Sequence, residues 1–488
     1  MDIIKGKENS VKKTVFITGA TGVMGFQTLK EFAAHPGRFD VRVLARPSKK
    51  NKQKLAPYIK MEGFHVEWGD LTKLDDVKRA MGRADYVLHI GGMVSPLADH
   101  YPELTLKVNT SAARNVVDAA MALPNADEVK VVYIGSVAMT SHHNEPYHWG
   151  RTGDPIMTGV FDYYGVSKII AEKIFSESGL RHWVSLRQSG ILHKGLIFNG
   201  SDPISFHVPL RGVLEWATVE DSGRLMYNLC ATELPGSFWR GFYNIGSGRN
   251  FRLSNYRFEQ LLLKALKCPP PEKVFDTKWF ALKNFHGEWF EDSDVLETLL
   301  HFREDITAED YFSRLASEMP WWMNLTPLAP ARLIKLAMRQ VAKTKELGPL
   351  DWLRRTDCED RINAFFGSRE KQASIPAWGD FDVSEPTHEP VRLNHGYDES
   401  KPESDLNLDD MRSAAEFRGG KCLSTSMITG DLDTPLEWQC AFGHKFTMRP
   451  RTVLKGGHWC PECLPAPWNY DNEAKVNPFL AQLWPVTE

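Results

Sequence analysis

Tyr164 and Lys168 are spaced as a proton-transfer pair would be, because they stand four residues apart in the run Tyr164-Gly165-Val166-Ser167-Lys168. On a helix this spacing places both side chains on one face, one turn apart. A tyrosine with its ordinary pKa of about 10 holds its proton near pH 7. A neighbouring ammonium group lowers that pKa by stabilising the phenolate. The pair is therefore expected to act as a general acid or base toward a carbonyl or an alcohol.

Four possible metal ligands stand near the C-terminus in two short pairs. Cys440 and His444 are spaced C-x3-H, and Cys460 and Cys463 are spaced C-x2-C. Three thiolates and one imidazole suit a closed, tetrahedral Zn²⁺ site of the structural kind. The pattern resembles that of zinc-ribbon modules, so metal binding is expected to hold this part of the chain together.

The ligand set and the role of this module are left open by the sequence. Cys422 and His458 are the substitutes if one of the four residues is not a ligand. Basic residues between the two pairs are compatible with nucleic-acid contacts, although a packing or oligomer role is favoured. These basic residues are Lys445, Arg449, Arg451 and Lys455.

The elements that must position these groups alternate along the first 200 residues. Short apolar runs predict strands at Val15–Thr18, Val41–Leu44, Phe64–Trp68, Tyr86–Ile90 and Val131–Ile134, and the helical patterns between them fall at Met24–Ala34, Leu74–Ala80 and Val108–Ala122. Such alternation predicts an α/β fold, a Rossmann doubly wound parallel sheet. Ser136 follows the fifth strand at the edge that borders the ligand crevice, so its hydroxyl is expected to hold the substrate oxygen.

A glycine-rich loop joins the first predicted strand to the first predicted helix. Its G-x-x-G-x-x-G pattern is typical of loops that bind a dinucleotide pyrophosphate at a helix N-terminus. The expected cofactor-binding residues of this loop are Gly19, Thr21, Gly22, Val23, Met24 and Gly25.

Arg46 occupies the position, after the second strand, that decides between NAD and NADP. A carboxylate there accepts a bond from the ribose 2′-hydroxyl, whereas an arginine accommodates a 2′-phosphate. Here Arg46 is followed by Lys49 and Lys50, and no carboxylate is present. The sequence therefore favours NADP(H), with NAD(H) as the alternative.

Together these motifs resemble the extended short-chain dehydrogenase/reductase family, the NAD-dependent epimerase/dehydratase-like group, over residues 12 to 325. The resemblance also rests on Gly69-Asp70-Leu71-Thr72, Val108-Asn109-Thr110 and Leu186-Arg187. It implies that Asp70 and Leu71 lie by the adenine ring and that Asn109 belongs to the catalytic network. It also implies a catalytic set of Ser136, Tyr164 and Lys168, with Tyr164 and Lys168 contacting the cofactor, and commonly a homodimer.

Some positions depart from the family pattern. Gly91-Gly92 replaces the usual alanine pair next to the expected nicotinamide site, which makes Gly91 a cofactor-binding candidate. Gln188 replaces the proline that usually follows the arginine, and the Thr-Asp-Glu segment of nucleotide-sugar 4,6-dehydratases is absent. The histidines of the loop His142-His143-Asn144-Glu145 either face the substrate or are solvated. These departures leave the substrate class open.

The bulk properties are those of an ordinary water-soluble enzyme of several domains. The chain has 488 residues, a net charge of −3 and seven cysteines, and its first residues lack the apolar core of a signal peptide. Nucleic acid is not expected as a partner, no membrane span is expected, and a cytoplasmic location fits the free cysteines. We expect a Rossmann domain over 1–200, a substrate-binding region with a helical extension over 201–371, a linker over 372–410 and a zinc-ribbon-like domain over 411–488.

Three functions remain in view. The first is an NADP(H)-dependent reductase or dehydrogenase that acts on a keto or hydroxy compound, for example a sugar derivative. The second is an NAD-dependent sugar epimerase that uses the same groups twice on one substrate. The third is a nucleotide-sensing adaptor whose zinc module binds a partner, although a sensor has no need of the Ser–Tyr–Lys set.

Overall fold

A computed structural model describes residues 12–140, 142–198, 202–320, 329–464 and 468–484. At its centre lies a seven-stranded sheet in the order β11-β7-β5-β4-β1-β2-β3, in which every neighbouring pair is parallel. The strands are β1 (Lys13–Thr18), β2 (Phe39–Ala45), β3 (Phe64–Trp68), β4 (Tyr86–His89), β5 (Lys130–Ser136), β7 (His182–Gln188) and β11 (Gly241–Ile245). The Rossmann doubly wound fold predicted from the sequence is confirmed.

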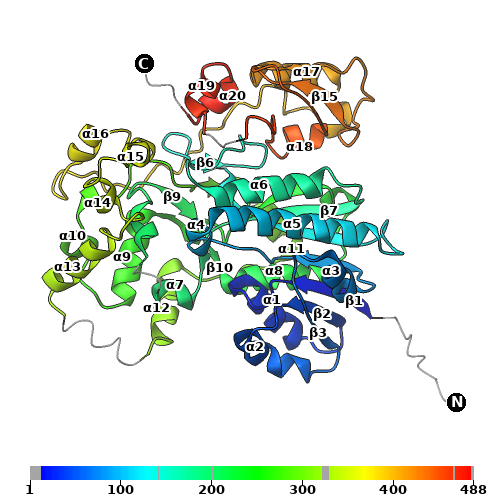
Figure 1. Cartoon of the computed structure of the whole chain (residues 1–488), viewed down its shortest axis with the longest axis horizontal. Coiled ribbons are helices and arrows are strands. Elements are labelled where there is room, and N and C mark those ends of the chain that lie inside the picture. The colour runs from blue at the N-terminus through cyan, green and yellow to red at the C-terminus, as the bar shows by residue number, and fades with distance from the viewer. Residues whose placement is uncertain (1–11, 141, 199–201, 321–328, 465–467, 485–488) are drawn as a thin grey trace.

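Helices cover both faces of this sheet (Figure 1). One face packs on α1 (Val23–Ala34), α2 (Lys49–Ile59), α8 (Val219–Ala231) and α11 (Asp294–Leu300). The other packs on α3 (Leu74–Met81), α5 (Pro102–Met121) and α6 (Tyr163–Ser176). Because both faces are buried, the central strands β1, β4 and β5 are nearly continuous apolar runs, whereas β2 and β3 at one side of the sheet carry polar residues at alternate positions.

The sheet domain does not end at residue 200, where the sequence predicted its boundary. Strand β11 forms the edge of the sheet beside β7, and helix α8 packs on α1. The chain thus leaves the sheet after β7, builds part of the second region and returns. The boundary was placed too early because the short apolar run of β11 lies among aromatic residues that resemble a separate domain.

The second region lies beside the carboxyl ends of the strands and is built from short elements. They are α4 (Leu97–His100), β6 (Trp149–Gly150), β8 (Ile191–Leu192), α7 (Lys194–Phe198), β9 (Val213–Glu215), β10 (Ala217–Thr218), β12 (Arg252–Ser254), α9 (Asn255–Ala265), α10 (Pro271–Val274), β13 (Trp289–Phe290), α12 (Ala308–Ser317), α13 (Ala331–Val341), α14 (Pro349–Trp352), α15 (Glu359–Phe366) and α16 (Arg369–Ala373). Their cores centre on clusters around Phe258 and Phe206.

Residues 375–400 form an extended arm rather than a free linker. Leu393 and His395 are buried in it, and His395 bonds to Asp154. The arm is polar in composition because its side chains pair with charged groups of the body. The sequence pattern did not distinguish such pairing from exposure to solvent.

The C-terminal module follows the arm and lies along helix α6 (Figure 1). Its elements are α17 (Leu408–Phe417), β14 (Lys421–Cys422), β15 (Leu436–Gln439), β16 (Lys445–Met448), α18 (Pro450–Leu454), α19 (Tyr470–Ala474) and α20 (Pro478–Ala481). The three strands form an antiparallel sheet over a small core around Trp438. Across the described residues, we find no helix with the length and apolar character needed to cross a bilayer.

Candidate functional site

The glycine loop is folded so tightly that side chains would not fit in it. Gly19 has a φ of +73°, and a Cβ built on it would lie 2.6 Å from the Gly91 Cα. A Cβ on Gly25 would lie 2.3 Å from the Gly19 carbonyl oxygen. Gly91 in turn fills the space between Gly19 and Leu71, which explains why a glycine replaces the family's usual alanine there. The loop therefore leaves an open cradle before helix α1, the kind of site that binds phosphates.

One cavity of about 1430 Å³ opens from this loop. It is larger than a pocket for one small molecule, which is typically about 300–1,000 Å³. All of the residues predicted to bind cofactor line it, as do Ser136, Tyr164 and Lys168. The structure thus gathers on one wall side chains that lie up to 149 positions apart in the sequence.

Tyr164 and Lys168 project from the first turns of α6, whose N-terminus is capped by Asp162 accepting a bond from the Gly165 N–H. The Lys168 Nζ lies 5.9 Å from the centre of the Tyr164 ring and donates to the Ile134 carbonyl at 2.9 Å. Burial lowers the pKa of Lys168 to about 8. This places the ammonium where the sequence predicted it, beside the phenol.

The Tyr164 phenol is nevertheless not acidic in this structure. Burial raises the pKa of Tyr164 to about 12. The hydrogen bond with Ser136 lowers this pKa, but its effect is smaller than that of burial. Near pH 7 the hydroxyl therefore carries its proton. A phenol in this state is ready to donate a proton to a carbonyl oxygen, which is the role of a general acid.

Asn109 lies behind this wall and does not line the cavity. Its side-chain amide donates to the Ser167 hydroxyl at 2.8 Å and to the Met93 carbonyl at 3.0 Å, while its oxygen accepts the Met93 N–H. Ser167 stands between Tyr164 and Lys168 on α6. Asn109 thus fixes the start of α6 against the segment after β4, a positioning role rather than contact with a reacting group.

In the loop His142-His143-Asn144-Glu145, the two histidines are buried, whereas Asn144 and Glu145 are exposed. His142 and His143 both line the cavity. The His142 Nδ1 lies 3.3 Å from the Phe285 carbonyl oxygen, and the His143 Nδ1 lies 2.9 Å from the Tyr147 carbonyl oxygen. A carbonyl only accepts, so in the neutral rings Nδ1 carries the proton and Nε2 is an acceptor. The His143 Nε2 lies 3.2 Å from the Glu288 Oε2, whereas the buried His142 Nε2 has no protein partner among the described residues.

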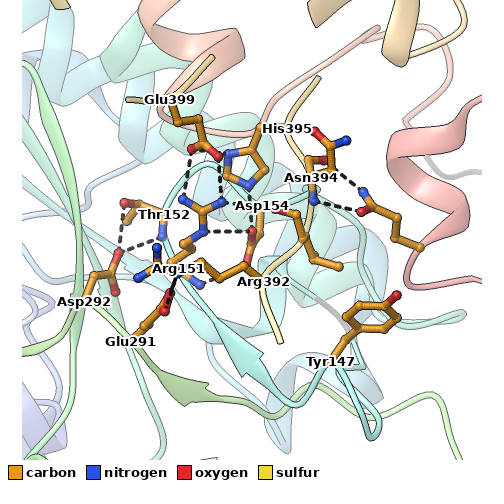
Figure 2. A network of polar contacts seen from close by, with 12 residues as sticks. Tyr147, Arg151, Thr152, Asp154, Glu291, Asp292, Arg392, Asn394, His395 and Glu399 are labelled. Carbon is orange, nitrogen blue, oxygen red and sulfur yellow. Dashed lines mark hydrogen bonds and ion pairs between the residues drawn. The ribbon is translucent and has the colours of Figure 1, made fainter. Parts of the chain in front are cut away.

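A polar network anchors this loop to the arm (Figure 2). The Arg151 guanidinium pairs with Glu399, and His395 lies between Glu399 and Asp154, 2.9 and 2.8 Å away. Thr152 donates to Asp292 through its backbone and its hydroxyl. Residues far apart in sequence therefore hold the segment after β6 against the arm, and no sequence motif indicated this.

Glu172 stands two turns beyond Tyr164 on α6 and is fully buried. Its carboxylate accepts bonds from Arg187 at 2.7 and 3.1 Å, from Ser185 at 2.6 Å, and lies 2.8 Å from the His458 Nε2. Burial would raise the pKa of Glu172, but Arg187 and His458 hold it at about 2. His458 thus bonds to the body of the protein, and it is not a member of the metal cluster below.

The four predicted metal ligands come together in the C-terminal module. Their ligand atoms all lie within 4.8 Å of one another. The Sγ atoms of Cys440 and Cys463 are 3.8 Å apart, and the His444 Nδ1 lies 3.7 and 3.4 Å from Cys460 and Cys463. A tetrahedron with Zn–S of about 2.3 Å and Zn–N of about 2.0–2.1 Å needs ligand separations of about 3.6–3.8 Å. The donor set and its spacing therefore fit zinc.

Three of the four basic residues between these ligands make hydrogen bonds or ion pairs within the chain. Arg449 donates to the carbonyls of Ser176 and Ser178 at the end of α6. Arg451 pairs with Asp433, and Lys455 lies 3.6 Å from Glu403. The Arg449 contacts attach the module to helix α6, whereas the Arg451 and Lys455 contacts lie within the C-terminal part of the chain, and Lys445 is left as the exposed one.

The half of the cavity beyond Ser136, the far half, was not predicted from the sequence. Gln188, Glu259 and the stacked rings of Trp216 and Phe258, 4.6 Å apart, line it. They come from β7, the segment between β9 and β10, and α9, which only the fold brings together. Gln188 was noticed as a departure from the family pattern, but nothing in its spacing indicated a place in the cavity.

Comparison with known proteins agrees with this architecture. Residues 15–187 match the family model "NAD dependent epimerase/dehydratase family". UDP-glucose 4-epimerase of Rickettsia felis is 30% identical over 131 residues, 26% of this chain and 37% of that protein. The 3 beta-hydroxysteroid dehydrogenase type 7 of Rattus norvegicus is 28% identical over 130 residues, with the same two coverages. The chain thus spans little more than a third of these relatives.

Among solved structures, dTDP-glucose 4,6-dehydratase from Streptomyces venezuelae has a similar fold. The TM-score is 0.51 at 16% identity, and the match covers 64% of this chain and 97% of that one. That structure holds NAD and TYD. At this identity the likeness concerns the fold. With the matching motifs and the gathered cavity, residues 15–187 of the chain are similar to the NAD-dependent epimerase/dehydratase family.

Proposed function

We propose that the chain is an NADP(H)-dependent oxidoreductase that interconverts a keto and a hydroxy compound. The observation that carries this proposal is the single cavity lined by the glycine loop and by Ser136, Tyr164 and Lys168. A bound nicotinamide would supply the hydride, and the cradle formed at Gly19 and Gly25 suits its pyrophosphate.

Each residue then has a chemical task. The Ser136 hydroxyl orients the substrate oxygen, and Tyr164 gives its proton to that oxygen as the carbonyl is reduced. Lys168, whose pKa of about 8 keeps it largely protonated at pH 7, stabilises the phenolate that remains. Since burial keeps the phenol protonated, with a pKa of about 12, Tyr164 begins at neutral pH as the proton donor that reduction requires.

The preference for NADP(H) is supported by the lining beyond β2. Arg46, Ser48, Lys50 and Asn51 all line the cavity there. Two cations and two hydrogen-bonding side chains suit a 2′-phosphate, and no carboxylate from this segment opposes it.

An NAD-dependent epimerase is the alternative, because relatives named UDP-glucose 4-epimerase match the cofactor half. An epimerase returns its hydride to the same substrate, so added NADPH is not consumed. A reductase consumes it in proportion to product. The nucleotide-sensing adaptor is less supported, because Arg449, Arg451 and Lys455 of the module are engaged in contacts within this chain.

We also propose that Cys440, His444, Cys460 and Cys463 bind one Zn²⁺ that holds the C-terminal module on helix α6. All seven cysteines are free. This supports a reducing compartment such as the cytoplasm, where thiols remain available as ligands. A homodimer stays a prediction from the family resemblance.

The test is turnover of purified protein with NADPH and a panel of ketones, followed at 340 nm. Tyr164→Phe should lose at least about a hundredfold in kcat while its affinity for NADPH, measured by fluorescence titration, stays the same. Tyr163→Phe, at the adjacent half-buried position whose ring packs on Trp468 and does not line the cavity, is the matched control. Unchanged turnover in Tyr164→Phe would overturn the assignment of the proton donor.

A further inference from the structure

The half of the cavity beyond Ser136 is predominantly apolar. Its wall includes Leu196, Val208, Leu214, Trp216, Phe258 and Leu262. Trp216 and Phe258 stack with an angle of 10° between their rings. A wall of this kind stabilises a bound hydrocarbon, because binding removes apolar surface from water. It offers few hydrogen-bond partners to a heavily hydrated ligand.

Basic side chains are confined to the other half. Among the described residues that line the cavity, the lysines and arginines are Arg46, Lys50, Lys107 and Lys168, all of which precede the far half in the chain. In the described lining from Gln188 to Gly287 there is no lysine or arginine. This half therefore lacks the cations that recognise phosphate groups in proteins.

The charged groups that the far half does contain are acids. Asp202 and Glu259 both line it, and Glu259 is buried on helix α9 with no charged neighbour that influences it. Burial raises the pKa of Glu259 to about 7. A diphosphate placed here would be desolvated beside two carboxyl groups, with no lysine or arginine in the described lining of this half to offset the cost.

Histidines do not supply the missing charge. Burial lowers the pKa of His142 to about 3 and of His286 to about 4, and it also lowers the pKa of His193. These rings are neutral at pH 7. Nor do two buried acceptors in the lining suit an anion, because the His142 Nε2 and the Gln188 Oε1 have no hydrogen-bond partner among the described residues and would take a hydrogen-bond donor.

On the strength of the proposed function, we propose that the substrate is an uncharged, largely apolar hydroxy or keto compound rather than a nucleoside diphosphate sugar. Its carbonyl meets Ser136 and Tyr164, and its hydrocarbon body lies against Trp216, Phe258 and Leu262. A second hydroxyl, where the substrate has one, is a donor to Glu259. The chemistry balances: the carbonyl carbon takes a hydride from NADPH, its oxygen takes the Tyr164 proton, and the products are an alcohol and NADP⁺.

The test compares a homologous series of ketones with a nucleotide. The probes are the 2-alkanones from 2-butanone to 2-decanone, and UDP and UDP-glucose, each added to the full chain with NADPH. Both turnover and binding, the latter by calorimetry, are measured. Burying each added methylene should raise affinity and kcat/KM by about three- to fourfold until the cavity is filled. UDP at 1 mM should show no binding.

Variants make the result specific to this wall. Trp216→Ala should flatten the dependence on chain length, whereas Leu282→Ala, at an exposed position outside the lining, should leave it unchanged. Leu262→Arg should weaken 2-decanone binding at least tenfold without weakening NADPH binding.

The outcomes separate this inference from the function on which it rests. Affinity that does not change with alkanone length, or UDP binding tighter than that of 2-decanone, overturns the apolar substrate class. Absence of NADPH and NADH binding instead overturns the proposed function. Length-dependent binding without NADPH oxidation supports the substrate class and contradicts the reductase chemistry.

Discussion

The Nε2 atom of His458 lies 2.8 Å from the Oε1 atom of Glu172, so the C-terminal module bonds directly to the helix that carries Tyr164 and Lys168. Both side chains are buried, and Arg187 completes the contact by donating to Glu172 and to the Gly456 carbonyl. The module therefore packs against the candidate catalytic helix through buried polar contacts.

His458→Ala should lower the free energy of unfolding by about 1.5–3 kcal/mol, because Glu172 would lose a charge-assisted hydrogen bond in the interior. Urea denaturation measures this. Lys445→Ala, at an exposed position of the same module, should change stability by less than about 0.5 kcal/mol. Equal effects of the two substitutions would show that the contact contributes nothing.

Zinc content should depend on the four clustered ligands and not on their neighbours. We expect one zinc per chain by mass spectrometry of metals, and its loss in Cys460→Ser. Cys422→Ser lies outside the cluster and is the matched control, and His458→Asn should also keep the metal. Zinc loss in His458→Asn with retention in Cys460→Ser would exchange the roles assigned to these residues.

Glu288→Gln should stabilise the protein at pH 8. Burial raises the pKa of Glu288 to about 7, so the folded state binds a proton that the unfolded state releases near its ordinary pKa. The wild-type free energy of unfolding therefore falls as pH rises from about 4.5 to 7, by up to about 3 kcal/mol from this group. Glutamine removes the ionisation, so this part of the pH dependence should vanish in denaturation at pH 5 and 8. A variant that is less stable at pH 8 would show that the carboxylate form is favoured.

Arg46→Glu should weaken NADPH binding about ten- to hundredfold and affect NADH much less, because the substitution places a carboxylate where a 2′-phosphate would sit. Fluorescence titration with both nucleotides measures the ratio. Lys60→Glu makes the same charge change at an exposed position at the end of α2 and should alter neither affinity. If Arg46→Glu weakens both nucleotides equally, the residue does not discriminate between them.

Gly91→Ala should reduce cofactor affinity at least tenfold, because the new Cβ would lie 2.8 Å from Leu71 and 3.0 Å from the Gly19 nitrogen. Overpacking of this kind typically costs about 1–3 kcal/mol. Gly236→Ala is the control, since a Cβ there meets nothing within 4 Å. Thermal unfolding and NADPH titration of both variants test the expectation. Normal NADPH binding by Gly91→Ala would mean that the glycine loop shifts to make room for the added Cβ.

The cofactor half could be predicted from the sequence because its signals are local. The strand before Gly19, the helix after it and the spacing of Tyr164 and Lys168 each depend on a few consecutive residues. The four metal ligands were predictable for the same reason. The phenol's pKa was not, because it depends on burial by distant segments rather than on the lysine one turn away.

The far half could not be predicted because no short pattern encodes it. Glu259, Trp216 and Gln188 become neighbours only when β7, α9 and the segment after β9 fold together. The arm around His395 looked like a linker because polar residues that pair in the interior have the same composition as polar residues in water.

The late position of β11 in the chain has a practical consequence. A fragment that ends near residue 200 would lack both β11 and α8, and it would expose the backbone N–H and C=O groups along the open side of β7 together with the apolar face of α1. Such an unpaired strand is a template for self-association. Expression of the nucleotide-binding half therefore needs at least residues 12–245, and shorter pieces should precipitate.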